Sequence, residues 1–201
     1  HHLEWLPSPF WDILADAVED DDGVLHREAK HGQNGGQDRL LAEGKVDLVV
    51  GYKYGSLPLR TKPCFAKDRD GAQEFVWNAL CENNLSSYLL SRDGKIAVFA
   101  KGCDARAILC DISEGQFERD NVVIIAVPCE GDIDRKKLSD RVAGREILDG
   151  ALDGETIRVS GDGFEVTLPV KELLCVGCVA CSHRMAPEFD LQLGDARPEI
   201  E

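Results

Sequence analysis

A long apolar stretch is missing from this sequence: no run approaches the roughly 20 consecutive hydrophobic residues that a membrane-spanning helix needs. The start also lacks the charged segment followed by a hydrophobic one that marks a secretory leader. These absences argue against direct membrane insertion and predict a soluble, cytoplasmic protein. The first residue is His1 rather than Met and the last is Glu201, so we leave open that the natural protein extends beyond either end.

Positive charge is also scarce. The sequence has 23 Lys and Arg residues against 37 Asp and Glu residues, which gives a formal net charge of −14. A surplus of negative charge opposes binding to DNA, RNA or an acidic membrane surface. No internal repeat is visible, and no G-x-G-x-x-G segment follows a candidate strand, so the usual dinucleotide-binding fingerprint is absent as well. We therefore expect partners other than nucleic acid.

Cysteine, by contrast, is abundant, with eight residues in a chain of 201. The sequence around these cysteines has none of the short, loop-rich character of a secreted disulfide scaffold. In a reducing compartment, such a surplus of cysteine indicates metal binding or redox chemistry.

Hydrophobic periodicity divides the sequence into three predicted parts. They are an N-terminal helix and linker over residues 1–44, an α/β core domain over 45–154, and a β-hairpin with a cysteine-rich segment over 155–201. Apolar residues recur at helical spacing between residues 3 and 19, and the polar, glycine-rich stretch that follows suits a linker.

The predicted core contains a short β-rich run, residues 46–50, which ends at Gly51, and two short, continuous apolar runs, residues 95–100 and 122–127. Strands of a parallel sheet that is buried on both faces have this composition. Helical spacing predicts one or two helices over residues 71–90, and a further helix between the last two strands.

Two more strands are predicted near the C-terminus. Residues 156–160 and 164–168 flank the sequence Gly-Asp-Gly at 161–163, which is typical of a β-hairpin. Together the elements predict an α/β fold, with a partly parallel sheet flanked by helices and a C-terminal β-hairpin and cysteine-rich cluster loop.

Two cysteines directly follow predicted strands. Cys103 comes after the strand 95–100, and Cys129 comes after the strand 122–127. If these strands are parallel neighbours joined by a right-handed crossover, both thiols emerge at the edge where open α/β sheets bind their ligands. A 4Fe–4S cluster needs four cysteine thiolates, so the other two must come from elsewhere in the chain.

Three further cysteines, Cys175, Cys178 and Cys181, lie close together with two residues between each pair. This spacing lets neighbouring thiolates turn toward one metal centre. A bacterial ferredoxin run would continue with a fourth cysteine before a proline, but residues 182–187 contain none. A distant cysteine must therefore complete the site.

Other hypotheses for these cysteines remain open. Zinc accepts the same thiolates, with His183 as a possible fourth ligand, which would make the chain a non-catalytic, zinc-stabilised adaptor subunit. A thiol–disulfide enzyme using Cys178 and Cys181 is a weaker hypothesis, because such pairs usually open a helix directly after a strand. The cysteines expected in the core or behind the site are Cys64, Cys81 and Cys110. A second cluster would draw on Cys64, Cys81 and Cys175.

Two segments are specific enough to compare with a known family, namely residues 101–106, Lys-Gly-Cys-Asp-Ala-Arg, and residues 128–131, Pro-Cys-Glu-Gly. They resemble segments of the beta subunits of deazaflavin-reducing hydrogenases and formate dehydrogenases, and of relatives in heterodisulfide-reductase-type complexes. The resemblance extends from residue 46 to residue 194. It also rests on the shorter segments 46–51, 55–60, 83–85 and 178–181.

The resemblance implies a flavin, FAD, beside a 4Fe–4S cluster. The subunit would relay electrons between a nicotinamide or deazaflavin carrier and partner iron–sulfur or flavin oxidoreductase subunits. The cysteines that match the family's cluster ligands are Cys103, Cys129, Cys178 and Cys181. Cys175 is an additional cysteine, and the N-terminal ferredoxin-like segment of many relatives is not recognisable, so the role of Cys175 and the number of clusters stay open.

Five basic or amide residues are candidates for holding flavin phosphates or ring edges, because such groups at sheet edges and helix starts suit anions. They are Arg60, Asn83, Asn84, Lys101 and Arg106. For each of them taken singly, an ordinary surface or helix-capping role is the alternative. The prediction of flavin binding therefore depends on the resemblance, and the sequence names no catalytic residue.

Overall fold

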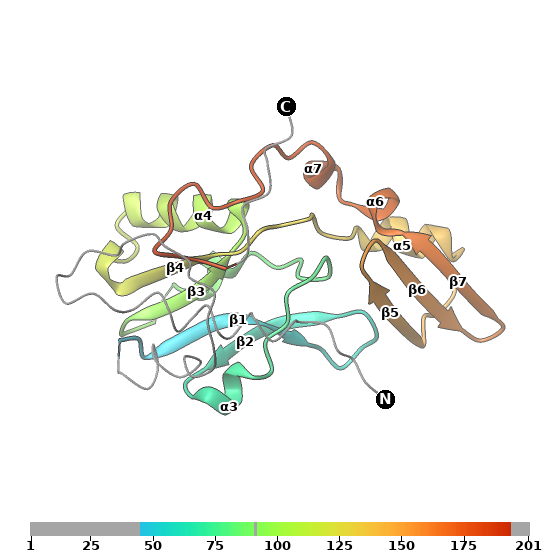
Figure 1. The fold of residues 1–201 in the computed structure, drawn as a ribbon, viewed down its shortest axis with the longest axis horizontal. Helices are drawn as coiled ribbons and strands as arrows, with labels where there is room; N and C mark the ends of the chain where they lie inside the picture. The colour runs from blue at the N-terminus through green and yellow to red at the C-terminus, as the bar shows by residue number, and fades with distance from the viewer. Residues whose placement is uncertain (1–44, 91, 194–201) are drawn as a thin grey trace, which may run out of the picture.

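The computed structural model describes residues 45–90 and 92–193, which form two β-sheets with helices packed against them (Figure 1). The larger sheet has five strands in the order β2-β1-β3-β4-β8, and the smaller has three in the order β5-β6-β7. The predicted N-terminal helix and linker lie outside the described residues. Among the helices of the described ranges, none is both long and apolar enough to cross a membrane.

The centre of the larger sheet consists of three parallel strands, β1 (Leu48–Tyr54), β3 (Ile96–Ala100) and β4 (Val122–Ala126). Every residue of β3 is buried, which explains why its sequence is a continuous apolar run rather than an alternating one. The helix α4 (Gly102–Ser113) connects β3 to β4, as predicted, and the 3-10 helix η2 (Arg119–Asn121) leads into β4. The predicted α/β fold class is confirmed.

Two short strands that the sequence did not predict form the edges of this sheet. β2 (Thr61–Ala66) pairs antiparallel with β1, and β8 (Leu191–Gln192) pairs parallel with β4. β2 contains Pro63, which an edge strand tolerates because its missing N–H is not needed by a second neighbour. β8 is fixed by Asp190, whose carboxylate accepts the Ile124 N–H at 2.7 Å.

The prediction that the first strand ends at Gly51 was wrong. β1 continues to Tyr54 and pairs with β2 from Val49 to Tyr54. Gly51 is required for packing instead, since a Cβ atom there would lie 2.9 Å from the ring of Phe99 and 3.1 Å from that of Phe75.

The one or two helical pieces predicted over residues 71–90 are much shorter in the structure than the predicted range. The helical elements in this stretch are α3 (Arg69–Ala72) and the 3-10 helix η1 (Leu85–Tyr88). Two asparagine side chains bond to nearby backbone and stabilise turns: Asn78 accepts the Leu80 N–H at 2.9 Å, and Asn84 accepts the Ser86 N–H at 3.0 Å. Such local bonds compete with a continuing helix.

The smaller sheet contains the predicted hairpin. β6 (Thr156–Gly161) and β7 (Phe164–Pro169) pair antiparallel, and Gly163 in the turn has φ of +71°. β5 (Asp149–Asp153) adds a third strand that the sequence did not predict. Along β6, buried residues such as Ile157 alternate with more exposed ones, as in a strand with one face on the core.

The C-terminal chain then returns from the smaller sheet to the larger one (Figure 1). Helix α5 (Arg135–Arg141) precedes the smaller sheet, and α6 (Val170–Leu173) and α7 (Val176–Val179) follow it. From α7 the chain runs back past the start of α4 and ends in β8 beside β4. This return brings the cysteine-rich segment to the larger sheet.

Candidate metal centre

Cys103 and Cys129 follow neighbouring parallel strands of the larger sheet. Cys103 lies in the first turn of α4, directly after β3, and Cys129 follows β4. The pairing of Ala100 with Ala126 shows that both strands end at the same edge. Burial raises the pKa of the Cys129 thiol to about 12, and the nearby charges of Asp132 and Cys103 act in the same direction. The predicted meeting of two strand ends is therefore present.

The start of α4 touches the C-terminal loop at Gly102. A Cβ atom on this residue would overlap the carbonyl oxygen of His183 and lie 2.8 Å from that of Met185. Only glycine allows this approach, because both obstacles are backbone atoms. The contact holds Cys103 next to the segment that follows Cys181.

A second close approach joins the segment after β4 to α7. Gly131 has φ of +104°, and a Cβ atom there would lie 3.1 Å from Leu174 Cδ2 and 3.2 Å from Cys178 Cβ. Two amides at this point donate to sulfur: Gly131 N–H to Cys129 Sγ at 3.3 Å, and Asp132 N–H to Cys178 Sγ at 3.4 Å. Amide donors of this kind stabilise metal-bound thiolates.

Backbone hydrogen bonds attach the cysteine-rich loop at both of its ends. The Cys175 N–H donates to the Asp132 carbonyl at 2.9 Å, and the Cys129 N–H donates to the Arg184 carbonyl at 3.0 Å. Arg184 Nη2 in turn donates to the Cys178 carbonyl at 3.0 Å. The loop is therefore fixed to the segment after β4 independently of any metal.

The donor set fits an iron–sulfur cluster in its chemistry, because its cysteines lie on three segments that contact one another at Gly102 and Gly131, and two of their sulfurs already accept amide hydrogen bonds. The coordination geometry is not preassembled: within residues 45–90 and 92–193, no three His, Cys, Asp or Glu side chains are arranged to hold a metal ion. The Cys181 thiol, for example, donates to the His183 carbonyl at 3.3 Å. Metal binding would therefore have to reorient thiols that the backbone has gathered.

The remaining cysteines and the proposed zinc ligand have different surroundings. Cys64 and Cys81 are buried, as expected for core residues. The expectation that Cys110 packs in the core or behind the site was wrong, because α4 turns its side chain to solvent. His183 is exposed, with Nδ1 2.8 Å from the Ser182 hydroxyl.

Lys101 forms a buried polar cluster beside the cysteines. Its side chain lies at the end of β3 with a relative exposure of 2%. The ammonium group donates to Tyr52 Oη at 3.2 Å, to the Asn83 carbonyl at 3.2 Å, to Asp132 Oδ2 at 3.3 Å and to the Cys81 carbonyl. Four oxygens from three separate segments therefore surround one positive charge.

The charges of this cluster support one another. Burial by itself lowers the pKa of Lys101, but the carboxylates of Asp104 and Asp132 outweigh it and leave the pKa raised, so the side chain is an ammonium ion at neutral pH. Asp104 Oδ2 lies 4.0 Å from Lys101 Nζ and accepts the Lys101 backbone N–H at 3.1 Å. Burial raises the pKa of Asp104 to about 6.

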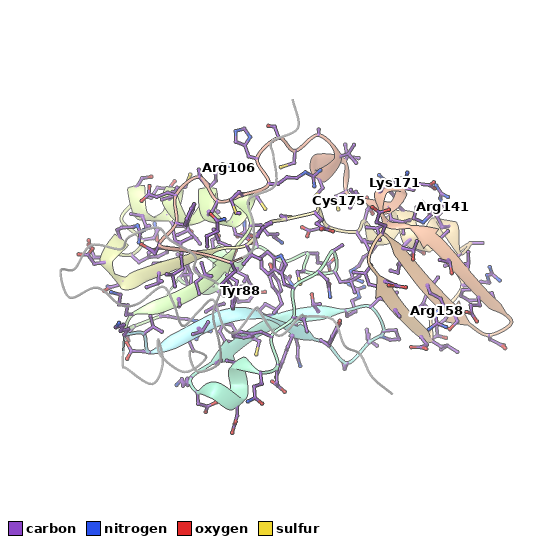
Figure 2. The ribbon with its side chains drawn as sticks, viewed as in Figure 1. Tyr88, Arg106, Arg141, Arg158, Lys171 and Cys175 are labelled. Carbon is purple, nitrogen blue, oxygen red and sulfur yellow. The ribbon has the colours of Figure 1, made fainter. Side chains whose placement is uncertain are left out.

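The other candidate flavin residues are dispersed. Asn84 caps η1 through its side chain, and Arg60 is exposed and lies 3.3 Å from Glu82. Arg106 projects from α4 into solvent (Figure 2). Of the five candidates, Asn83 and Lys101 contact each other, because the Lys101 ammonium group donates to the Asn83 backbone carbonyl. The five residues do not form one cradle, so we derive no step through a flavin.

Sequence reasoning identified the thiols but missed the residues that bring them together. Gly102 and Gly131 permit the two close approaches, and Asp132 connects the segment after β4 to Cys178. A signal was present, because each glycine lies within two residues of a cysteine that follows a predicted strand. A glycine in that place allows another backbone to approach closely.

Comparison with known proteins gives a distant relationship. No family model matches the chain. The F420-dependent formate dehydrogenase 1 subunit beta of Methanococcus maripaludis is 26% identical over 172 residues, which cover 78% of this chain and 44% of that protein. A solved chain of the F420-reducing [NiFe] hydrogenase complex from Methanosarcina barkeri gives a TM-score of 0.48 at 19% identity, covering 72% of this chain and 56% of that one. This chain is thus a distant homologue of the beta subunit of F420-dependent formate dehydrogenase and spans less than half of its length.

Proposed function

We propose that this chain is an iron–sulfur electron-transfer subunit of a multi-subunit oxidoreductase. The proposed cluster ligands are Cys103, Cys129, Cys178 and Cys181. The observation that carries the proposal is the meeting of the two strand-end segments with the cysteine-rich loop at Gly102 and Gly131. The distant relationship to a formate dehydrogenase beta subunit also supports a role as an oxidoreductase subunit.

A 4Fe–4S cluster at this site would accept and release single electrons. The protein's own contribution would be to hold four thiolates from three segments and to direct amides at their sulfurs. The Gly131 and Asp132 N–H groups already have this orientation toward Cys129 and Cys178. Hydrogen bonds to cluster sulfurs set the reduction potential, so these two amides are part of the proposed electron-transfer chemistry.

The electron carrier and the partners are further parts of the proposal. The name of the formate dehydrogenase relative favours a deazaflavin carrier, with a nicotinamide carrier as the alternative. The partners would be other iron–sulfur or flavin subunits, since a single cluster can only pass electrons onward. FAD binding stays a prediction from the family resemblance, and flavin fluorescence after denaturation of the purified protein would test it.

Anaerobic purification followed by electron paramagnetic resonance tests the proposal. The protein reduced with dithionite should give the signal of a reduced 4Fe–4S cluster and should lose it on reoxidation. A colourless protein that contains zinc and gives no such signal would contradict the proposal. That outcome would favour the zinc-stabilised adaptor, whose metal has no redox chemistry.

A further inference from the structure

The Lys101 ammonium ion connects the ends of the parallel strands to the loops beyond them. Lys101 directly follows β3 and caps the start of α4, Tyr52 lies near the end of β1, and Asp132 lies in the segment after β4. The Asn83 carbonyl brings in the chain before η1. No other described segment supplies a cation to this group of oxygens in the hydrogen bonds and ion pairs that we observe.

Asp132 extends this connection to the cysteine-rich loop. Its carboxylate accepts from Lys101, its N–H donates to Cys178 Sγ at 3.4 Å, and its carbonyl accepts the Cys175 N–H at 2.9 Å. The Cys175 carbonyl in turn accepts hydrogen bonds from the N–H groups of Cys178 and Val179 in α7. A continuous chain of bonds thus runs from Lys101 to two of the cysteines.

We propose that Lys101 is a positioning residue that acts through Asp132 to hold the cysteine-rich loop in place for the cluster. The role of the loop as a cluster site rests on the proposed function, whereas the ordering of the loop by Lys101 does not. This assignment differs from the flavin contact expected from the sequence, because protein oxygens already take up the donors of the ammonium group.

The energetics favour such a role. A buried ammonium ion is tolerated only when it is paired and hydrogen-bonded, so its partners are held in place as strictly as the ion itself. The side chains of Lys101 and Asp132 are 3% and 15% exposed, so solvent screens their attraction little. Hydrogen bonds that involve a charged group are shorter and stronger than neutral ones. The pair therefore restricts Asp132, whose backbone carries the two bonds to the loop.

Asp132→Ala is the variant that tests the proposal. It removes the carboxylate but keeps the backbone groups that bond Cys175 and Cys178. Lys101 retains its three other oxygens and Asp104 at 4.0 Å, so its charge is not left unpaired and the chain should fold. Lys101→Met is the companion variant, because it removes the ammonium group and leaves Asp132 intact.

Amide hydrogen exchange on the full, metal-free chain is the first measurement. Exchange at the Cys175, Cys178 and Val179 amides should be about tenfold faster in Asp132→Ala, as expected when a charge-assisted bond is lost. Asp132→Asn should restore most of the protection, since Asn keeps an acceptor for Lys101. Asp190→Ala is the matched control, with a side chain 18% exposed and paired with Arg119. In this control, faster amide exchange should be confined to residues near β4 and β8.

The second measurement follows the cluster in anaerobically reconstituted protein. Both Asp132→Ala and Lys101→Met should change the resonance line shape and the reduction potential of any cluster that forms, which a purely structural defect elsewhere would not do. Unchanged exchange at Cys175 and Cys178 in both variants would overturn the positioning role. Failure of the wild-type chain to take up iron would overturn the proposed function instead, and the exchange result would still decide the role of Lys101.

Discussion

Replacing Gly131 by Ala tests whether the close approach between the segment after β4 and α7 builds the site. Gly131 has φ of +104°, a conformation that residues with a Cβ atom rarely adopt. The new methyl group would also lie 3.1 Å from Leu174 Cδ2 and 3.2 Å from Cys178 Cβ. The substitution therefore combines backbone strain with a steric push directly on a proposed ligand.

The expected magnitude can be divided between these two effects. A positive φ on a residue other than glycine costs about 1–2 kcal/mol, and local strain of this type totals about 1–3 kcal/mol. A decrease of about 2 kcal/mol in the free energy of unfolding lowers Tm by about 4–8 °C in a chain of this size. Gly163→Ala is the matched control, because Gly163 has φ of +71° and nothing within 4 Å of its added Cβ. The control should therefore show backbone strain alone, about 1 kcal/mol.

Thermal unfolding and iron content, measured on both variants, separate these contributions. Gly131→Ala should melt at a lower temperature than Gly163→Ala and should bind less iron, whereas Gly163→Ala should retain the wild-type iron content. Equal iron content in the two variants would refute the claim that the approach of Gly131 to Cys178 helps to form the site. Equal melting temperatures would refute the steric argument.

Three further substitutions test individual positions. Cys103→Ala should abolish the cluster, while Cys110→Ala, on the same helix and likewise exposed, should keep its iron and lower the free energy of unfolding by less than about 0.5 kcal/mol; equal iron contents would contradict the strand-edge assignment. Cys175→Ala should retain iron, because the backbone N–H of Cys175, and not its thiol, bonds to the segment after β4. If Cys175→Ala lost its iron while Cys103→Ala kept it, the site would be a local three-cysteine loop. Gly102→Ala should lower Tm and iron uptake, since its Cβ would overlap the His183 carbonyl; unchanged melting in differential scanning calorimetry would rule out that contact.

The parts of the fold that could be predicted are those whose pattern has one physical explanation. β3 and β4 are buried on both faces, so their sequences are short apolar runs that few other structures produce. Parallel neighbours end at one edge, so the strand order alone predicts that Cys103 and Cys129 emerge at the same edge of the sheet. The hairpin of β6 and β7 was equally clear from its alternating pattern and glycine turn.

The parts that could not be predicted depend on tertiary contacts. β2 and β8 are edge strands with few apolar residues, so their pairing partners determine their conformation. Residues 71–90 have helical spacing, but their buried aromatic groups pack on the sheet from turns; the rings of Phe75 and Phe99, for instance, meet edge to face at 5.3 Å. Lys101 resembled a surface cation in sequence, and only the fold shows it enclosed by four oxygens.

The central claim is that thiols from three separate segments hold one iron–sulfur cluster, and iron and acid-labile sulfide per chain test it most directly. The anaerobically purified protein should be brown and contain about four irons and four sulfides per chain, as a single 4Fe–4S cluster requires. A chain with stoichiometric zinc and no labile sulfide would contradict the account.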